Sequence, residues 1–186
     1  MARLAGLAAV VSALAMMLLA INAQATFLGS APSLTETGAG CASLPSGEVC
    51  ANLFANGDAM APGGPAEVRA VALTLTGGGN HTEVGLHLQN FLSRGPASDD
   101  TCSAADPGSK FDFEVTVAGR VLYTGSLAGF AATYSGSARQ LPIPGRSGGW
   151  ARGDQVRVTL AVRLDASADN SYMGCTTDTD FVWLAA

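Results

Sequence analysis

Alternation of apolar and polar side chains over Gln155–Leu164, interrupted only by Ala161, is the feature that most limits what this chain can fold into. The apolar positions are Val156, Val158, Leu160, Val162 and Leu164. Because successive side chains of a β-strand point to opposite faces, this pattern predicts a strand with one buried face and one solvated face. Asp165–Asn170 then predicts a turn, since Asp, Ser and Asn side chains bond their own backbone there. A second strand is expected near Asp178–Leu184, with Phe181 and Trp183.

Similar patterns recur earlier in the chain. Further strands are expected at Glu67–Thr76, Glu83–Phe91, Phe111–Val117, Arg120–Thr124 and Ser137–Ile143. Glu67–Thr76 is apolar at nearly every position after Arg69, which is typical of a strand covered on both faces. Ala118-Gly119 predicts a tight hairpin turn, and Ser126–Phe130 predicts one helical turn. With 23 glycines among 186 residues, these turn-separated strands predict an all-β fold, a jelly-roll-like antiparallel β-sandwich after an N-terminal signal helix.

Residues 1–25 have the form of a signal peptide. Arg3 supplies a positive charge, Leu4–Ile21 is apolar, and Ala23-Gln24-Ala25 is a small-x-small cleavage site. An apolar run of about 18 residues can also span a membrane, but the cleavage site favours removal. We therefore expect a secreted protein, extracellular or at the cell surface, that meets a membrane only during export. The rest divides into an N-terminal extension over residues 26–52 and a β-sandwich domain over residues 53–186.

Four cysteines follow the cleavage site: Cys41, Cys50, Cys102 and Cys175. An even number of cysteines in an exported chain predicts disulfides, and four cysteines allow three pairings. Cys41 with Cys50 is the local choice, and it leaves Cys102 to pair with Cys175. A zinc site of four thiolates is the competing possibility, but no C-x2-C spacing supports it.

The sequence offers no recognisable catalytic constellation and implies no cofactor. The formal charge of −5 is unclustered, so nucleic acid is not an expected partner. His81 and His87 are the only histidines. His81 falls in a loop and His87 on the polar side of a strand, so we expect both to be solvent-exposed and neither to bind metal.

The carboxylates concentrate in turns. They include Asp99, Asp100, Asp106, Asp165, Asp169, Asp178 and Asp180. Such exposed positions should leave their pKa values near normal. The turn that begins at Asp165 could give oxygens to calcium, but calcium takes about six to eight ligands. Because a twelve-residue loop with a closing glutamate is missing, ordinary turn chemistry is the favoured interpretation.

The end of the chain carries a motif of an amide, a tyrosine and a glycine before an aromatic strand. Its residues are Asn170, Tyr172, Gly174, Phe181 and Trp183. Together with Leu53-Phe54 before Ala61-Pro62-Gly63, and with Arg120–Phe130, this motif resembles the TasA/camelysin family of secreted matrix proteins, which carry SipW-type signal peptides. The likeness covers about Phe54–Trp183.

This resemblance implies a jelly-roll subunit that polymerises into extracellular or biofilm matrix fibres and is not an enzyme. In that family an N-terminal segment completes the sheet of the next subunit. The matching segment here would be Thr26, Phe27, Leu28, Gly29 and Ser30. The expected partners are other copies of the chain, with matrix components or glycans as further ones. The alternative is a secreted monomeric β-sandwich that binds a glycan or a protein.

Overall fold

The structure is a computed structural model that describes most of the chain after residue 33. The described residues are 34–37, 41–44, 47–51, 53–54, 60–77, 83–94, 104–145, 149–172 and 174–186. All of them belong to one compact unit, Pro32–Ala186. The expected signal peptide, the candidate segment Thr26–Ser30, His81 and Cys102 lie outside the described residues.

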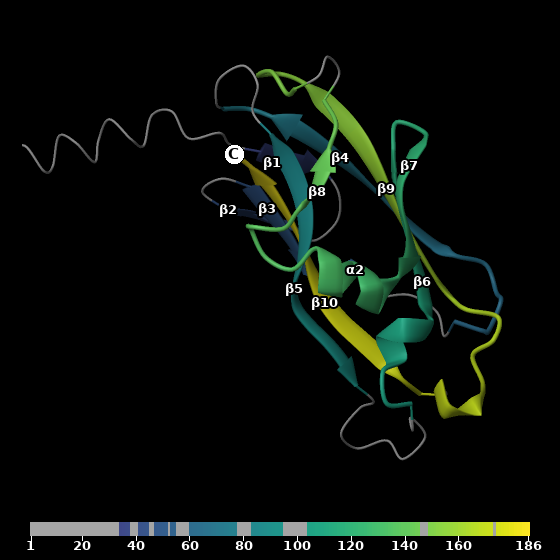
Figure 1. Cartoon of the computed structure of the whole chain (residues 1–186). Coiled ribbons are helices and arrows are strands. Elements are labelled where there is room, and N and C mark those ends of the chain that lie inside the picture. The colour runs from purple at the N-terminus through teal and green to yellow at the C-terminus, as the bar shows by residue number, and fades with distance from the viewer. Residues whose placement is uncertain are drawn as a thin grey trace, which may run out of the picture. The chain divides into compact units, whose positions relative to one another are not determined.

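Ten strands in the described part form two five-stranded sheets (Figure 1). They are β1 (Leu34–Thr37), β2 (Cys41–Leu44), β3 (Gly47–Ala51), β4 (Glu67–Leu75), β5 (Val84–Arg94), β6 (Phe111–Val117), β7 (Arg120–Ser126), β8 (Leu141–Ile143), β9 (Gln155–Leu164) and β10 (Thr176–Ala185). The first sheet has the order β1-β4-β9-β6-β7 and the second the order β2-β3-β10-β5-β8. Neighbouring strands are antiparallel throughout, so the predicted all-β sandwich is confirmed.

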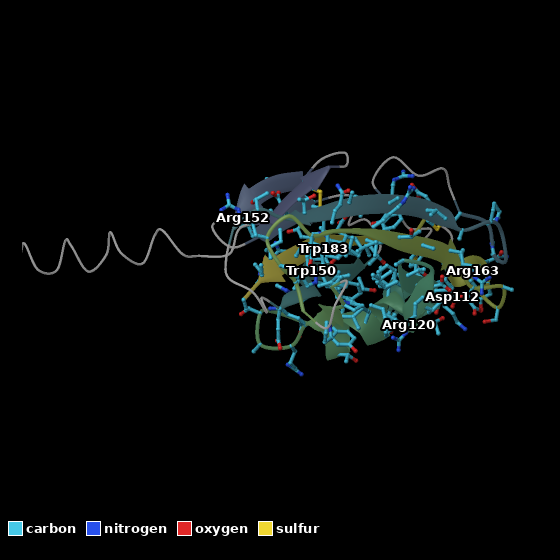
Figure 2. All side chains as sticks on the ribbon, turned by 90° about the horizontal axis from the view of Figure 1, so that it is seen from above. Asp112, Arg120, Trp150, Arg152, Arg163 and Trp183 are labelled. Carbon is cyan, nitrogen blue, oxygen red and sulfur yellow. A yellow bond between two sulfur atoms is a disulfide. The ribbon has the colours of Figure 1, made fainter. Side chains whose placement is uncertain are left out.

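The core fills the space between the two sheets, and β9 contributes to it as its alternation predicts. All five apolar positions of β9 are buried, whereas Gln155, Arg157 and Arg163 are exposed. The facing sheet contributes alternate residues of β5 and β10, including Leu86, Phe181 and Trp183. Figure 2 shows Trp183 and Trp150 inside the fold.

The connections that the sequence predicted between β6 and β8 are present. Ala118 and Gly119 both have positive φ, at 49° and 82°, which is the backbone of a tight hairpin turn. The helical turn extends to a helix, α2 (Leu127–Thr133). Its first turn is capped by the Ser126 hydroxyl, which accepts the Gly129 N–H at 3.0 Å. Two 3-10 turns, η1 (Pro107–Lys110) and η2 (Asn170–Tyr172), complete the described helices.

Two strand predictions need correction. The outer face of β4 is not covered, because Val68 is 51% exposed and Ala70 is exposed. Small apolar side chains tolerate contact with water at modest cost. Apolar residues on both faces of β4 therefore did not require both faces to be buried. The strand expected over Ser137–Ile143 is only β8, because Arg139 N–H donates to Gly136 O in a turn before it.

The predicted exposure of His87 is wrong. His87 is fully buried, at 0% exposure, on the face of β5 that points away from the main core. It lies opposite Val182 of β10, which is also buried. Burial disfavours the charged imidazole and lowers the pKa of His87. His87 does lie on the side of β5 opposite its core-facing residues, as the alternation predicted. That side of the strand is itself buried at His87, so a polar residue there does not meet water.

Candidate binding cleft between the sheet edges

Both sheets are incomplete at the same end of the sandwich. β1 pairs only with Ala72–Leu75 of β4, and β3 pairs only with Asp180–Leu184 of β10. The remaining parts, residues 67–71 of β4 and residues 176–179 of β10, therefore have a described strand on one side only. Such edges present unpaired backbone groups that another strand can satisfy.

A cleft of about 820 Å³ lies between these two free edges. Its residues come from both sheets and from the connections near them: Leu53, Phe54, Met60, Pro62, Glu67, Phe111, Leu127, Val162, Leu164, Ala168, Asp169, Asn170, Tyr172, Gly174, Cys175, Thr176, Thr177, Asp178, Thr179 and Phe181. We call this set the cleft. It includes Glu67 from the free part of β4 and Thr176–Thr179 from the free part of β10.

The inner part of the cleft is apolar and aromatic. Phe54 packs edge-on against Phe181, with ring centroids 5.8 Å apart. Val162 and Leu164, the last inward residues of β9, supply the wall of the other sheet. Apolar side chains from a partner would therefore lose contact with water here, which is favourable at roughly 25 cal/mol per Å² of buried surface.

An ion pair lies on the β4 side of the cleft. Glu67 and Arg69 bond each other, and both occupy the inward parity of β4 that Val71 and Leu73 continue into the core. Arg69 Nε also donates to Leu53 O at 3.1 Å. The Arg69 guanidinium lies 5.9 Å from the centroid of the Phe54 ring. Arg69 thus fastens the segment after β3 to the free half of β4.

Two polar atoms of the cleft are buried without a hydrogen-bond partner in the described part of the chain. They are Oε2 of Glu67 and the Thr177 hydroxyl oxygen, one from each sheet. Buried polar groups of folded proteins are nearly always hydrogen-bonded. An occupant that brings hydrogen-bond donors would supply what both atoms lack.

The loop between β9 and β10 forms the rim of the cleft. Asp165 accepts the Ser167 N–H at 2.7 Å, and Asp169 accepts the Ser171 N–H at 2.9 Å. This confirms the predicted turn chemistry. The hydroxyl and backbone N–H of Ser167 lower the pKa of Asp165, and those of Ser171 lower the pKa of Asp169. The expectation that both pKa values stay near normal is therefore wrong, because a charged carboxylate that accepts two bonds is favoured.

Disulfides lie near the fold's edges. Cys41 and Cys50 are joined across the β2–β3 hairpin, with an S–S distance of 1.97 Å, which confirms the local pairing. Cys175 in the cleft rim is also disulfide-bonded. Its predicted partner, Cys102, lies outside the described residues, so that pairing stays a prediction. Disulfides are typical of proteins outside the cytoplasm.

The motif that carries the family resemblance falls mostly on the cleft. Asn170, Tyr172, Gly174 and Phe181 line it. Trp183 does not, because it is buried deeper in the core with its Nε1 unpaired among the described residues.

The cleft also depends on residues that sequence reasoning missed. Glu67, Arg69 and Thr177 were not singled out, although charges on the inward parity of an otherwise apolar strand are a readable signal. By contrast, no sequence signal shows that β1 and β3 pair with only part of β4 and β10, which leaves the edges beside the cleft free.

Within the described ranges, no three His, Cys, Asp or Glu side chains gather as metal ligands would. None of the helices described there combines the length and apolarity that a membrane span requires.

No protein-family model matches the chain, and no match was found among curated proteins.

Proposed function

We propose that this protein is a secreted structural subunit of extracellular or biofilm matrix fibres, and that it assembles by strand addition. The cleft is the observation that carries the proposal. It combines a free edge on each sheet with an apolar interior, and these are the two features that an added strand uses. The role needs no catalysis, in keeping with the resemblance to secreted matrix proteins.

The proposed donor is the segment Thr26–Ser30, at the start of the chain left by cleavage after residue 25. Chain length favours insertion into a second copy. Leu34 pairs with Leu75 at the end of β4 farthest from the free half, which ends at Glu67. Going back from Leu75 to Val71, where the free half begins, takes about 13 Å at roughly 3.3 Å per residue. Within one molecule this would use about half of the eight residues before Leu34, and few would remain to pair with the free half.

Donation to another copy also explains how a fibre would grow. The donor segment of one copy would enter the cleft of the next copy, and the donor segment and the cleft are different parts of the molecule. Contacts of this head-to-tail kind form an open filament when the rotation between copies does not close a ring.

The strand order supports the jelly-roll form of the sandwich. From β3 to β10 the paired strands nest: β6 with β7, β5 with β8, β4 with β9, and β3 with β10. Such nesting is that of one long antiparallel ribbon wound across two sheets, which is the arrangement of a double Greek-key jelly roll.

Electron microscopy and size-exclusion chromatography of the mature chain test the proposal. We expect fibres from the chain that starts at Thr26 and monomers after replacement of Phe27 and Leu28 by aspartate. Replacement of Thr26 and Ser30 by alanine is the matched control, because it keeps the apolar side chains and should keep the fibres. Monodisperse monomers of the unaltered mature chain over a range of concentration and pH would contradict the proposal.

A monomeric binding module is the second candidate. The cleft volume of about 820 Å³ lies within the range of roughly 300–1,000 Å³ that holds small ligands. Tyr172 and Asn170 at the rim could bind a glycan or a peptide. A glycan array probed with the monomeric protein would distinguish this function, since saturable binding that competes with a peptide of residues 26–33 favours it.

A further inference from the structure

We infer that the incoming segment pairs with the free half of β10, through Thr177 and Thr179, and that Arg69 closes the free half of β4 to it. This inference rests on the proposed function and assigns one of two possible edges to the occupant, residues 26–33 of a second copy. The two edges differ in their backbone groups and in what already bonds to them.

On β10, the direction of each backbone group follows from the end of the strand. Ala186 and Glu83 exchange both backbone bonds, at 2.8 and 2.9 Å, so the backbone of Ala186 points to the β5 side. In an antiparallel pair these directions alternate along the strand. The register shift between Asp178 and Asp180 sets two steps along β10 against three along β5, so the extra residue belongs to β5 and the alternation of β10 continues past it. Even-numbered residues of β10 therefore point to β5, and the N–H and C=O groups of Thr177 and Thr179 point to the free side.

On β4, the same reasoning selects different residues. Leu75 N–H donates to Asp154 O at 3.0 Å, and Leu75 O accepts from Gly153 N–H at 2.7 Å. Leu75 thus points to the β9 side, and the odd-numbered residues of β4 do likewise. The backbone groups of Val68 and Ala70 are the ones that point to the free side.

The β4 edge is already engaged by Arg69. The guanidinium donates to Val68 O at 3.4 Å as well as to Leu53 O at 3.1 Å. It also pairs with Glu67 on the inward parity. Inward-pointing charges are one means by which proteins protect edge strands from pairing. A strand added to β4 would have to displace the bond to Val68 O and pass the Arg69 side chain that the other two bonds hold in place.

Among the described residues, nothing comparable protects the β10 edge. No described residue bonds the backbone of Thr177 or Thr179 on the free side, and the Thr177 hydroxyl is buried without a partner. Residues 176–179 would accept about 13 Å of extended chain at roughly 3.3 Å per residue. A segment laid there continues the line of β3 beyond Ala51 and places alternate side chains against Phe54 and Phe181.

Hydrogen exchange of the mature chain, compared between monomers and assemblies, tests the assignment. We expect the amides of Thr177 and Thr179 to exchange at least tenfold more slowly in the assembly, and those of Val68 and Ala70 to be unchanged. Protection of Val68 and Ala70 alone would overturn the inference and leave strand addition standing. Assemblies with no protection at either edge would overturn both, and so would a mature chain that never assembles.

Proline substitution provides the second test. Thr177→Pro removes an N–H that points away from β5, so the β5 ladder is kept, as for proline on natural edge strands. We expect it to reduce assembly at least tenfold, whereas Thr177→Val keeps the N–H and should retain assembly. Ala70→Pro is the matched change on β4 and should also retain it. Loss of assembly in Ala70→Pro, with assembly retained in Thr177→Pro, would reverse the assignment.

Discussion

Acid should destabilise this fold through His87, at pH values where the carboxylates are still charged. The imidazole is fully buried, and neither ring nitrogen has a hydrogen-bond partner among the described residues. Burial lowers the pKa of His87 below its ordinary value of 6.5. The unfolded chain therefore takes up a proton near pH 6.5 that the folded chain does not bind, so stability is present above this pH and falls below it.

The magnitude follows from proton linkage. One proton bound only by the unfolded state changes the free energy of unfolding by about 1.4 kcal/mol per pH unit. Between pH 7 and pH 5 the loss is at most about 2 kcal/mol, because the unfolded histidine is only partly protonated at the upper end. With a urea m-value of about 2 kcal/mol/M, the midpoint would fall by about 1 M.

Urea unfolding of the wild type and of His87→Leu, at both pH values, measures this effect. His87→Leu removes the titrating group together with two unpartnered nitrogens. We therefore expect its stability at pH 7 to be similar or higher, with little change at pH 5. His81→Leu is the control, because it removes the other histidine and should keep the wild-type response. A full acid response in His87→Leu would refute the reasoning.

Three further predictions test individual contacts. Replacing Cys41 and Cys50 together by serine should lower the free energy of unfolding, measured with urea, by about 3 kcal/mol in the chain-entropy model. Peptide mapping of the wild type should recover these two cysteines linked to each other. Ser126→Ala removes the cap of α2 and should cost about 1 kcal/mol in the same assay. Ser167→Ala should raise the pKa of Asp165, followed by NMR titration, because the serine hydroxyl lowers it; an unchanged titration would contradict that cause.

The alternation of apolar and polar residues predicted the strands correctly wherever one face of a strand meets the core. β9 and β6 follow their alternation closely, since a shift of one residue would move every apolar side chain to the other face. The local disulfide and the Ala118-Gly119 turn were also predictable, because both depend on residues close together in the chain.

Features that depend on distant parts of the chain were less accessible. Nothing local shows that the outer side of β5 is buried at His87 or that the outer side of β4 is open at Val68. The cleft likewise results from where β1 and β3 end, and those ends are set by pairing partners far away in the sequence. The motif at Asn170 and Tyr172 indicated this region, but not its shape.

The two strands nearest the C-terminus occupy the middle of the fold. β9 lies between β4 and β6, and β10 lies between β3 and β5. A chain that emerges from its N-terminal end, from a ribosome or through a narrow pore, cannot finish either layer until these last strands are free. Earlier strands must wait without their central neighbours, so folding is postponed to the moment of release. Under the proposed export, this order of events would keep the polypeptide loose enough for translocation.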